Sequence, residues 1–253
     1  MSRKIKKGFG FTLAEGATHV NLLPTKAKFG FTLAEVLITL GIIGVVAAIT
    51  IPALINNYKA ARLKSQFLKS YSTIQQVFKR MQDDEISTDP KSYKEGKTYY
   101  KIFANYLAGA TVCDIGTTKS LCYNTGRDKI LYKGINWWYL DDGQIVLPDG
   151  TLLMFENMQG STNVMVTVDL NGIKNPPNME GFDTFTFQLV NDELHTMGDI
   201  GTNYVGEEYC DFDKIINQAD ANLNDHAPAL YGIACAHYAK VDADYFKKIV
   251  KKK

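Results

Sequence analysis

The sequence lacks the short motifs that mark most catalytic sites. It contains no GxSxG motif of serine hydrolases, no HExxH motif of zinc proteases and no phosphate-binding P-loop. The pair Asp141-Asp142 precedes a glycine in a turn-like DDG, where solvated carboxylates are expected. Because no catalytic constellation emerges, the sequence predicts a protein that is not an enzyme and requires no cofactor.

Charge is almost absent from residues 31–55, FTLAEVLITLGIIGVVAAITIPALI, where Glu35 is the one charged side chain. As a helix rising about 1.5 Å per residue, this run is long enough to cross a hydrocarbon core of about 30 Å. Residues 1–30 contain six Lys and Arg against one Glu. A basic leader before an apolar run is a membrane-targeting pattern that keeps the leader in the cytoplasm. We therefore expect the chain after the run to be exported.

Cysteine is scarce and never occurs as CxxC, which argues against a zinc ribbon or a redox motif. Cys113 and Cys122 lie nine residues apart, and Cys210 and Cys235 lie 25 apart. In an exported chain, two structural disulfides are the economical interpretation, and we choose the sequential pairing among three connectivities. Four unpaired buried thiols are the alternative.

A positive partner for Glu35 is missing from the apolar run, which contains no Lys, Arg or His. A carboxylate at full depth in a membrane costs about 2.5–3.5 kcal/mol and normally has a partner. A cut between Gly30 and Phe31 would create an α-ammonium group one helical turn before Glu35. That amine, on the same chain or on a neighbour, could be the partner.

These residues carry a family resemblance. The order KFG, FTLAE and a long apolar run resembles the signal of type IV pilins and type II secretion pseudopilins. The resemblance implies that prepilin peptidase cuts after Gly30 and that Phe31 becomes methylated. It also implies that Glu35 meets the N-terminal amine of a filament neighbour, and Pro52 matches a proline that many members carry.

The resemblance further implies what the chain contacts and where. Its partners would be other pilin or pseudopilin subunits, prepilin peptidase, an inner-membrane assembly platform and the membrane itself. The chain would first reside in the cytoplasmic membrane as a single-pass protein with its head outside the cytoplasm. It would then enter a periplasmic pseudopilus or a cell-surface pilus. The alternative is a membrane-anchored exported binding protein or enzyme that never polymerises.

The seven residues FGFTLAE occur twice, at residues 9–15 and 29–35. The first copy has the peptidase consensus but continues as GATHVNLLPTKAK, in which polar residues and Pro24 prevent a spanning helix. We interpret it as part of the leader. A decoy or second processing site is the alternative.

Four segments are predicted along the chain. Residues 1–30 are a leader that is removed, residues 31–55 a transmembrane and assembly helix, residues 56–85 its amphipathic continuation, and residues 86–253 a globular head. The continuation has apolar residues at helical spacing, namely Leu63, Phe67, Tyr71, Ile74, Phe78 and Met81. The helix is expected to run from about Phe31 to about Asp83.

The head is predicted to hold an antiparallel β-sheet packed on this helix, which makes the fold class α+β. INWWYL, QIVLPDGTLLMFE, NVMVTVDL and DTFTFQLV are rich in β-branched and aromatic residues. Gln144–Leu147 and Thr151–Phe155 form a predicted hairpin around a Pro-Asp-Gly turn. TYYKIFANYLAG is a predicted helix, and the Trp137-Trp138 pair is expected in the core. The final KKIVKKK is expected to be a solvated tail.

A candidate calcium site lies in VDLNGIKNPPNMEGFD, where Asp169, Asn171 and Asp183 are oxygen ligands. Such residues in loops also cap turns through nearby backbone groups, and we favour this alternative. The chain after residue 30 carries 22 Lys and Arg against 26 Asp and Glu. General electrostatic affinity for nucleic acid is therefore not expected.

Overall fold

The computed structural model describes residues 30–93, 98–114, 121–124, 131–157, 163–217 and 230–252. The chain divides into two compact units between Ala48 and Ile49. The predicted leader and the first FGFTLAE copy lie outside the described residues, apart from Gly30.

One long helix, α1 (Leu33–Asp83), dominates the N-terminal part of the chain and continues through Pro52. It contains a stretch that is long and apolar enough to cross a membrane, and none of that stretch is buried by the rest of the protein. The helix ends in a Schellman motif, because Ile86 N–H donates to the Met81 carbonyl (2.8 Å) and Glu85 N–H to the Gln82 carbonyl (3.0 Å). Glu85 takes the left-handed conformation, with φ 57°.

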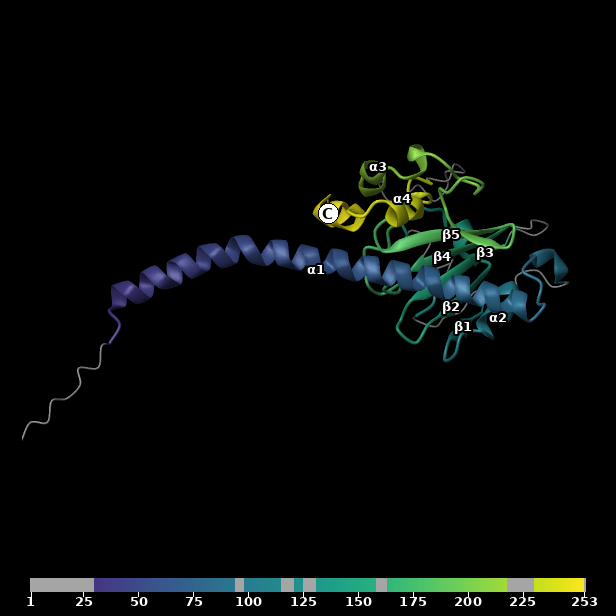
Figure 1. The fold of residues 1–253 in the computed structure, drawn as a ribbon, viewed down its shortest axis with the longest axis horizontal. Helices are drawn as coiled ribbons and strands as arrows, with labels where there is room; N and C mark the ends of the chain where they lie inside the picture. The colour runs from purple at the N-terminus through teal and green to yellow at the C-terminus, as the bar shows by residue number, and fades with distance from the viewer. Residues whose placement is uncertain are drawn as a thin grey trace, which may run out of the picture. The chain divides into compact units, whose positions relative to one another are not determined.

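The second half of α1 packs on a sheet of six strands, as Figure 1 shows. All neighbouring strands are antiparallel and follow the chain order: β1 (Thr111–Cys113), β2 (Gly143–Val146), β3 (Leu152–Glu156), β4 (Val164–Asp169), β5 (Thr184–Val190) and β6 (Glu193–Thr196). The predicted hairpin is confirmed as β2 and β3, with Val146 opposite Leu152. The α+β fold class is therefore confirmed.

Both faces of the sheet are buried, each by its own hydrophobic cluster. The first cluster joins α1, α2 (Tyr99–Ala104) and the C-terminal helices to the sheet, with Phe67 at its centre. The Phe67 ring lies 4.8 Å from Phe185 in β5 and 5.8 Å from Phe246 near the C-terminus. The predicted apolar stripe is confirmed, since all of its members are buried except the half-buried Tyr71.

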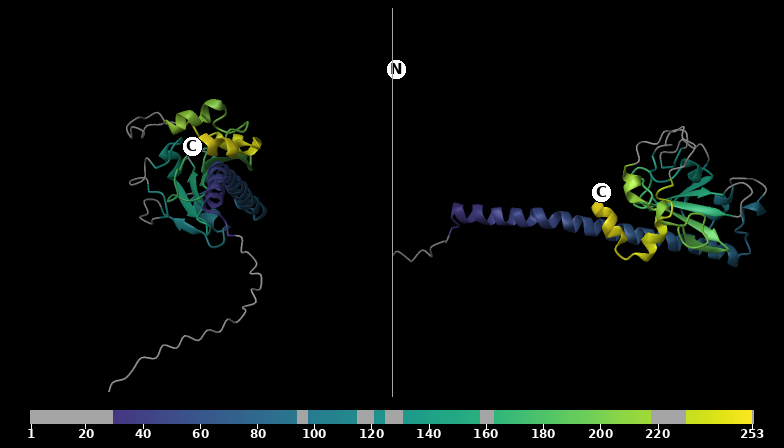
Figure 2. Two further views of the ribbon diagram at one scale, coloured as in Figure 1. Left: turned by 90° about the vertical axis from the view of Figure 1, so that its left-hand side faces the viewer. Right: turned by 90° about the horizontal axis from the view of Figure 1, so that it is seen from above.

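The short helices complete the head, and Figure 2 shows α4 and α5 on the same side of the sheet as α1. They are η1 (Pro90–Ser92), η2 (Trp137–Leu140), η3 (Glu207–Tyr209), α3 (Phe212–Ile216), α4 (Cys235–Val241) and α5 (Tyr245–Lys252).

Two segments differ from the sequence prediction. INWWYL is not a strand but contains η2, whose first turn is capped by Asn136 accepting from Trp138 N–H at 3.0 Å. Trp137 packs on the second hydrophobic cluster, whereas the Trp138 side chain is 49% exposed. Only one of the two tryptophans therefore belongs to the core.

The C-terminal tail is also not solvated. It forms α5, in which Tyr245, Phe246, Ile249 and Val250 are buried and the intervening lysines face outward. The four apolar residues recur at helical spacing, so one face of α5 packs on the head. The run of lysines obscured this pattern in the sequence.

Candidate processing and assembly site

The start of α1 has a capping box that holds Glu35. Thr32 precedes the helix, and its hydroxyl accepts a hydrogen bond from Glu35 N–H at 3.2 Å. In return, the Glu35 carboxylate oxygen Oε2 accepts from Thr32 N–H at 2.8 Å and from the Thr32 hydroxyl at 2.7 Å. These reciprocal bonds satisfy helix N–H groups that have no partner within the helix.

The capping box gives the Glu35 carboxylate partners within its own chain. A carboxylate at a helix N-terminus is stabilised by the helix dipole and by the free N–H groups of the first turn. Glu35 therefore has local partners before any cut takes place. Hydrolysis of the Gly30–Phe31 bond would place a positive charge directly before Thr32. Gly30 and Phe31, the residues on either side of that bond, are both exposed among the residues that the structure describes.

The four cysteines form two disulfides with sequential connectivity. Cys113 at the end of β1 is bonded to Cys122, and Cys210 is bonded to Cys235 at the start of α4. The first bond ties a loop to an edge strand, and the second ties the segment after η3 to the C-terminal helices.

The structure brings the three candidate calcium ligands together in one loop. Asp169 Oδ1 accepts from Asn171 N–H at 3.2 Å and from Gly172 N–H at 2.9 Å. Asp183 accepts from the backbone of the same loop, with Met179 N–H at 2.8 Å from Oδ1. These bonds are the turn-capping contacts that compete with calcium. Calcium binding by Asp169, Asn171 and Asp183 stays a prediction.

The electrostatics of this loop are unusual for carboxylates. Burial, followed by the negative charge of Asp183, raises the pKa of Asp169 to about 7. The hydrogen bond from the Tyr132 hydroxyl, at 2.8 Å from Asp169 Oδ2, acts in the opposite direction. At neutral pH a substantial fraction of Asp169 is therefore protonated.

One cluster of carboxylates was missed at the sequence level. Asp141, Asp142 and Glu156 each offer an oxygen, and these oxygens lie within 4.8 Å of one another. Asp142 is buried and accepts from Asn157 N–H at 3.0 Å, so the expectation of a solvated turn was wrong for this residue. The pairing of β2 with β3 brings Asp142 and Glu156 together, and no local pattern in the sequence signals it.

Comparison with known families identifies the N-terminal segment. Residues 25–51 match the family model described as the prokaryotic N-terminal methylation motif. This segment is the signature of type IV pilins and pseudopilins. It includes Gly30, Phe31, Thr32 and Glu35 and most of the apolar part of α1.

The pilin signature ends at residue 51 and does not reach the head. The comparisons with curated proteins and with solved structures find no match. The signature supports a pilin-like protein with an N-terminal membrane anchor and an exported head. Any more specific role has to be argued from the residues of this chain.

Proposed function

We propose that the chain is a structural subunit of a type IV pilus or a type II secretion pseudopilus, and not an enzyme. The observation that carries the proposal is that the methylation motif coincides with the Thr32–Glu35 capping box and an unburied apolar helix. In this account prepilin peptidase hydrolyses the bond between Gly30 and Phe31. The leader keeps the new carboxyl group, and the new amine on Phe31 is then methylated.

Assembly in this account uses the apolar half of α1 twice. Residues 31–55 first hold the subunit in the cytoplasmic membrane with its head outside. The same surface then packs against the apolar helices of neighbouring subunits, at the inner-membrane assembly platform. Lipid chains are as apolar as these side chains, so packing alone gives little directional preference.

In this account Glu35 fixes how neighbouring subunits align along the helix axis. An unpaired carboxylate in an apolar environment is unfavourable, whereas a charge-assisted hydrogen bond to an ammonium group is about twice as strong as a neutral one. The N-terminal amine of a neighbour offers that bond at one axial position only. Subunits shifted along the helix axis would leave the ammonium group without a carboxylate and Glu35 with only its neutral partners on Thr32, so the ion pair selects the aligned arrangement.

The experiment compares Glu35→Ala with the unchanged full chain, expressed in a host that has prepilin peptidase and a filament assembly machinery. We expect Glu35→Ala to insert into the membrane and to lose filaments from the sheared surface fraction or the periplasm. Glu193→Ala is the matched control, because Glu193 is an exposed carboxylate of the head. Filaments of Glu35→Ala at the unchanged level would contradict the proposal. A wild-type chain that inserts but never assembles would favour the membrane-anchored alternative.

A further inference from the structure

The charges of the mature chain are separated between α1 and the head. Residues 56–80 contain six Lys and Arg and no Asp or Glu. Residues 81–253 contain 16 Lys and Arg against 25 Asp and Glu, a net charge of −9. Such a strong separation favours contact between the helix of one copy and the head of another, because their opposite charges attract.

Three of the basic side chains lie on one exposed face of α1. Arg62, Lys69 and Arg80 are exposed and follow one another by 7 and 11 residues. At 3.6 residues per turn, this spacing puts them in line over about 27 Å of helix. Lys69 forms an ion pair with Asp149 at 2.6 Å. Among the residues that the structure describes, Arg62 and Arg80 have no carboxylate partner. We call Arg62, Lys69 and Arg80 the basic face.

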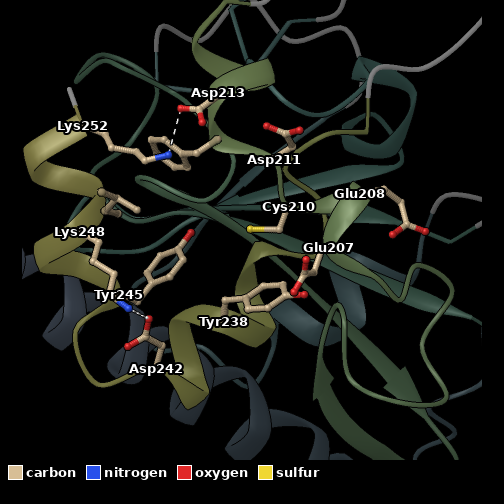
Figure 3. Close-up of a pocket in the computed structure, with 12 residues that line it drawn as sticks. Glu207, Glu208, Cys210, Asp211, Asp213, Tyr238, Asp242, Tyr245, Lys248 and Lys252 are labelled. Carbon is tan, nitrogen blue, oxygen red and sulfur yellow. Dashed lines mark hydrogen bonds and ion pairs between the residues drawn. The ribbon is translucent and has the colours of Figure 1, made fainter.

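A pocket of about 510 Å³ lies between η3, α3, α4 and α5 of the head. Figure 3 shows it with Tyr238 and Tyr245 on one side and acidic residues around its edge. We call it the C-terminal pocket, and its lining includes Glu207, Glu208, Asp211, Asp213 and Asp242.

Most acidic groups of the C-terminal pocket are already paired. Lys248 donates to Asp242 at 2.7 Å, and Lys252 reaches across from α5 to Asp213 at 3.0 Å. Both pairs are drawn as dashed lines in Figure 3. Asp211 lies 3.2 Å from Lys214.

Glu207 and Glu208 differ from these paired acids. Both are exposed, and neither has a cationic partner within the described ranges. Figure 3 places Glu207 beside Tyr238, whose ring face can also receive a cation. The edge of the pocket therefore presents Glu207 beside an aromatic ring, an arrangement that suits a guanidinium group, and a second unpaired carboxylate, Glu208, farther along the same edge.

We propose that the basic face of α1 in one subunit docks on the edge of the C-terminal pocket in a second copy of the chain, with one of its two unpaired arginines, Arg62 or Arg80, paired to Glu207 or Glu208 of that copy. The inference rests on the proposed function, because assembly is what brings the copies together. Arginines that become desolvated in a filament need carboxylate partners. Within the described part of the head, Arg62 and Arg80 have no carboxylate partner, and a neighbouring copy can provide one.

The first test is a charge exchange in the full chain, with sheared filaments as the readout. We expect Arg62→Glu together with Arg80→Glu to lower filament yield about tenfold, because like charges then face each other. Glu207→Lys together with Glu208→Lys should lower filament yield by a similar factor. Combining all four changes should restore at least half of the wild-type yield. Glu193→Lys, an exposed acid outside the C-terminal pocket, is the matched control and should assemble normally.

The second test detects the contact directly and does not depend on a variant that assembles poorly. A photo-reactive p-benzoylphenylalanine replaces Val205, an exposed residue two positions before η3 that takes no part in the proposed ion pairs, in subunits mixed with the wild type, and the trapped peptide is identified by mass spectrometry. We expect a peptide of a second copy that contains residues 59–80.

The outcomes separate this inference from the function on which it rests. Crosslinks to lipid, to another protein or to a different segment would overturn the docking. An unchanged filament yield in the charge-exchange variants would also overturn it. If the wild type is cut at Gly30 but forms no filaments, the proposed function is wrong, and the docking proposal that depends on it is wrong as well.

Discussion

Glu180 is a fully buried carboxyl group whose ionisation should contribute strongly to the pH dependence of head stability. Its side chain is inaccessible to solvent, and its Oε1 accepts a hydrogen bond from the Thr186 hydroxyl at 2.6 Å. Burial raises its pKa from 4.5 to about 8, the Thr186 and Gly181 hydrogen bonds oppose this, and the charge of Asp183 adds to it. In the folded head Glu180 is therefore protonated at neutral pH.

The sign of the effect follows from linkage. The folded state binds the proton more tightly than the unfolded state, so the head loses stability as pH rises through the window between the two pKa values. Each pKa unit corresponds to about 1.4 kcal/mol. Between pH 4 and pH 7 this single group should lower the free energy of unfolding by about 3 kcal/mol. The loss continues to about pH 8, where the folded carboxyl group ionises.

Glu180→Gln tests this reasoning because the amide stays neutral in both states. We expect its unfolding free energy, relative to the wild type, to improve by about 3 kcal/mol between pH 4 and pH 7, whatever its offset at pH 4. Urea unfolding of the mature chain in non-ionic detergent, followed by the fluorescence of Trp137 and Trp138, gives both values. Glu193→Gln, at an exposed site, is the control. A difference for Glu180→Gln that stays constant over this range would refute the reasoning.

Two further predictions concern the packing of the head. Phe67→Ala should lower the free energy of unfolding by about 3–5 kcal/mol, because Phe67 is fully buried between α1 and the sheet. Leu68→Ala, at the adjacent exposed position, should have little effect in the same urea titration, and equal losses would contradict this packing. Cys235→Ser should cost about 3 kcal/mol by opening the loop from Cys210. A reductant opens Cys113–Cys122 in both proteins, so it should remove the difference in stability between the wild type and the variant.

The long helix and the central strands could be predicted because their signals are local. The apolar residues of α1 recur at a helical period, and the hairpin of β2 and β3 surrounds a Pro-Asp-Gly turn. The edge strands β1 and β6 have three and four residues and could not be recognised. Their pairing depends on the neighbouring strands rather than on a run of their own.

The features of the head that matter for docking are not local. The C-terminal pocket joins residues from 207 to 252 through tertiary packing, and the apolar face of α5 packs on distant residues such as Phe67 in α1 and Phe185 in β5. The capping box, by contrast, corresponds to a local sequence pattern, Thr-x-x-Glu before an apolar run, so it could have been predicted from the sequence. Its overlap with the processing motif concealed it.

The most direct test of the pilin account is the mass of the N-terminal peptide of the protein recovered from its native membranes. The account predicts a chain that begins at Phe31 and carries one methyl group on its α-amine. A chain that begins at Phe11 would make the first FGFTLAE the functional processing site. An uncut Met1 start, in cells whose peptidase processes another substrate, would contradict the account and leave a plain membrane-anchored protein.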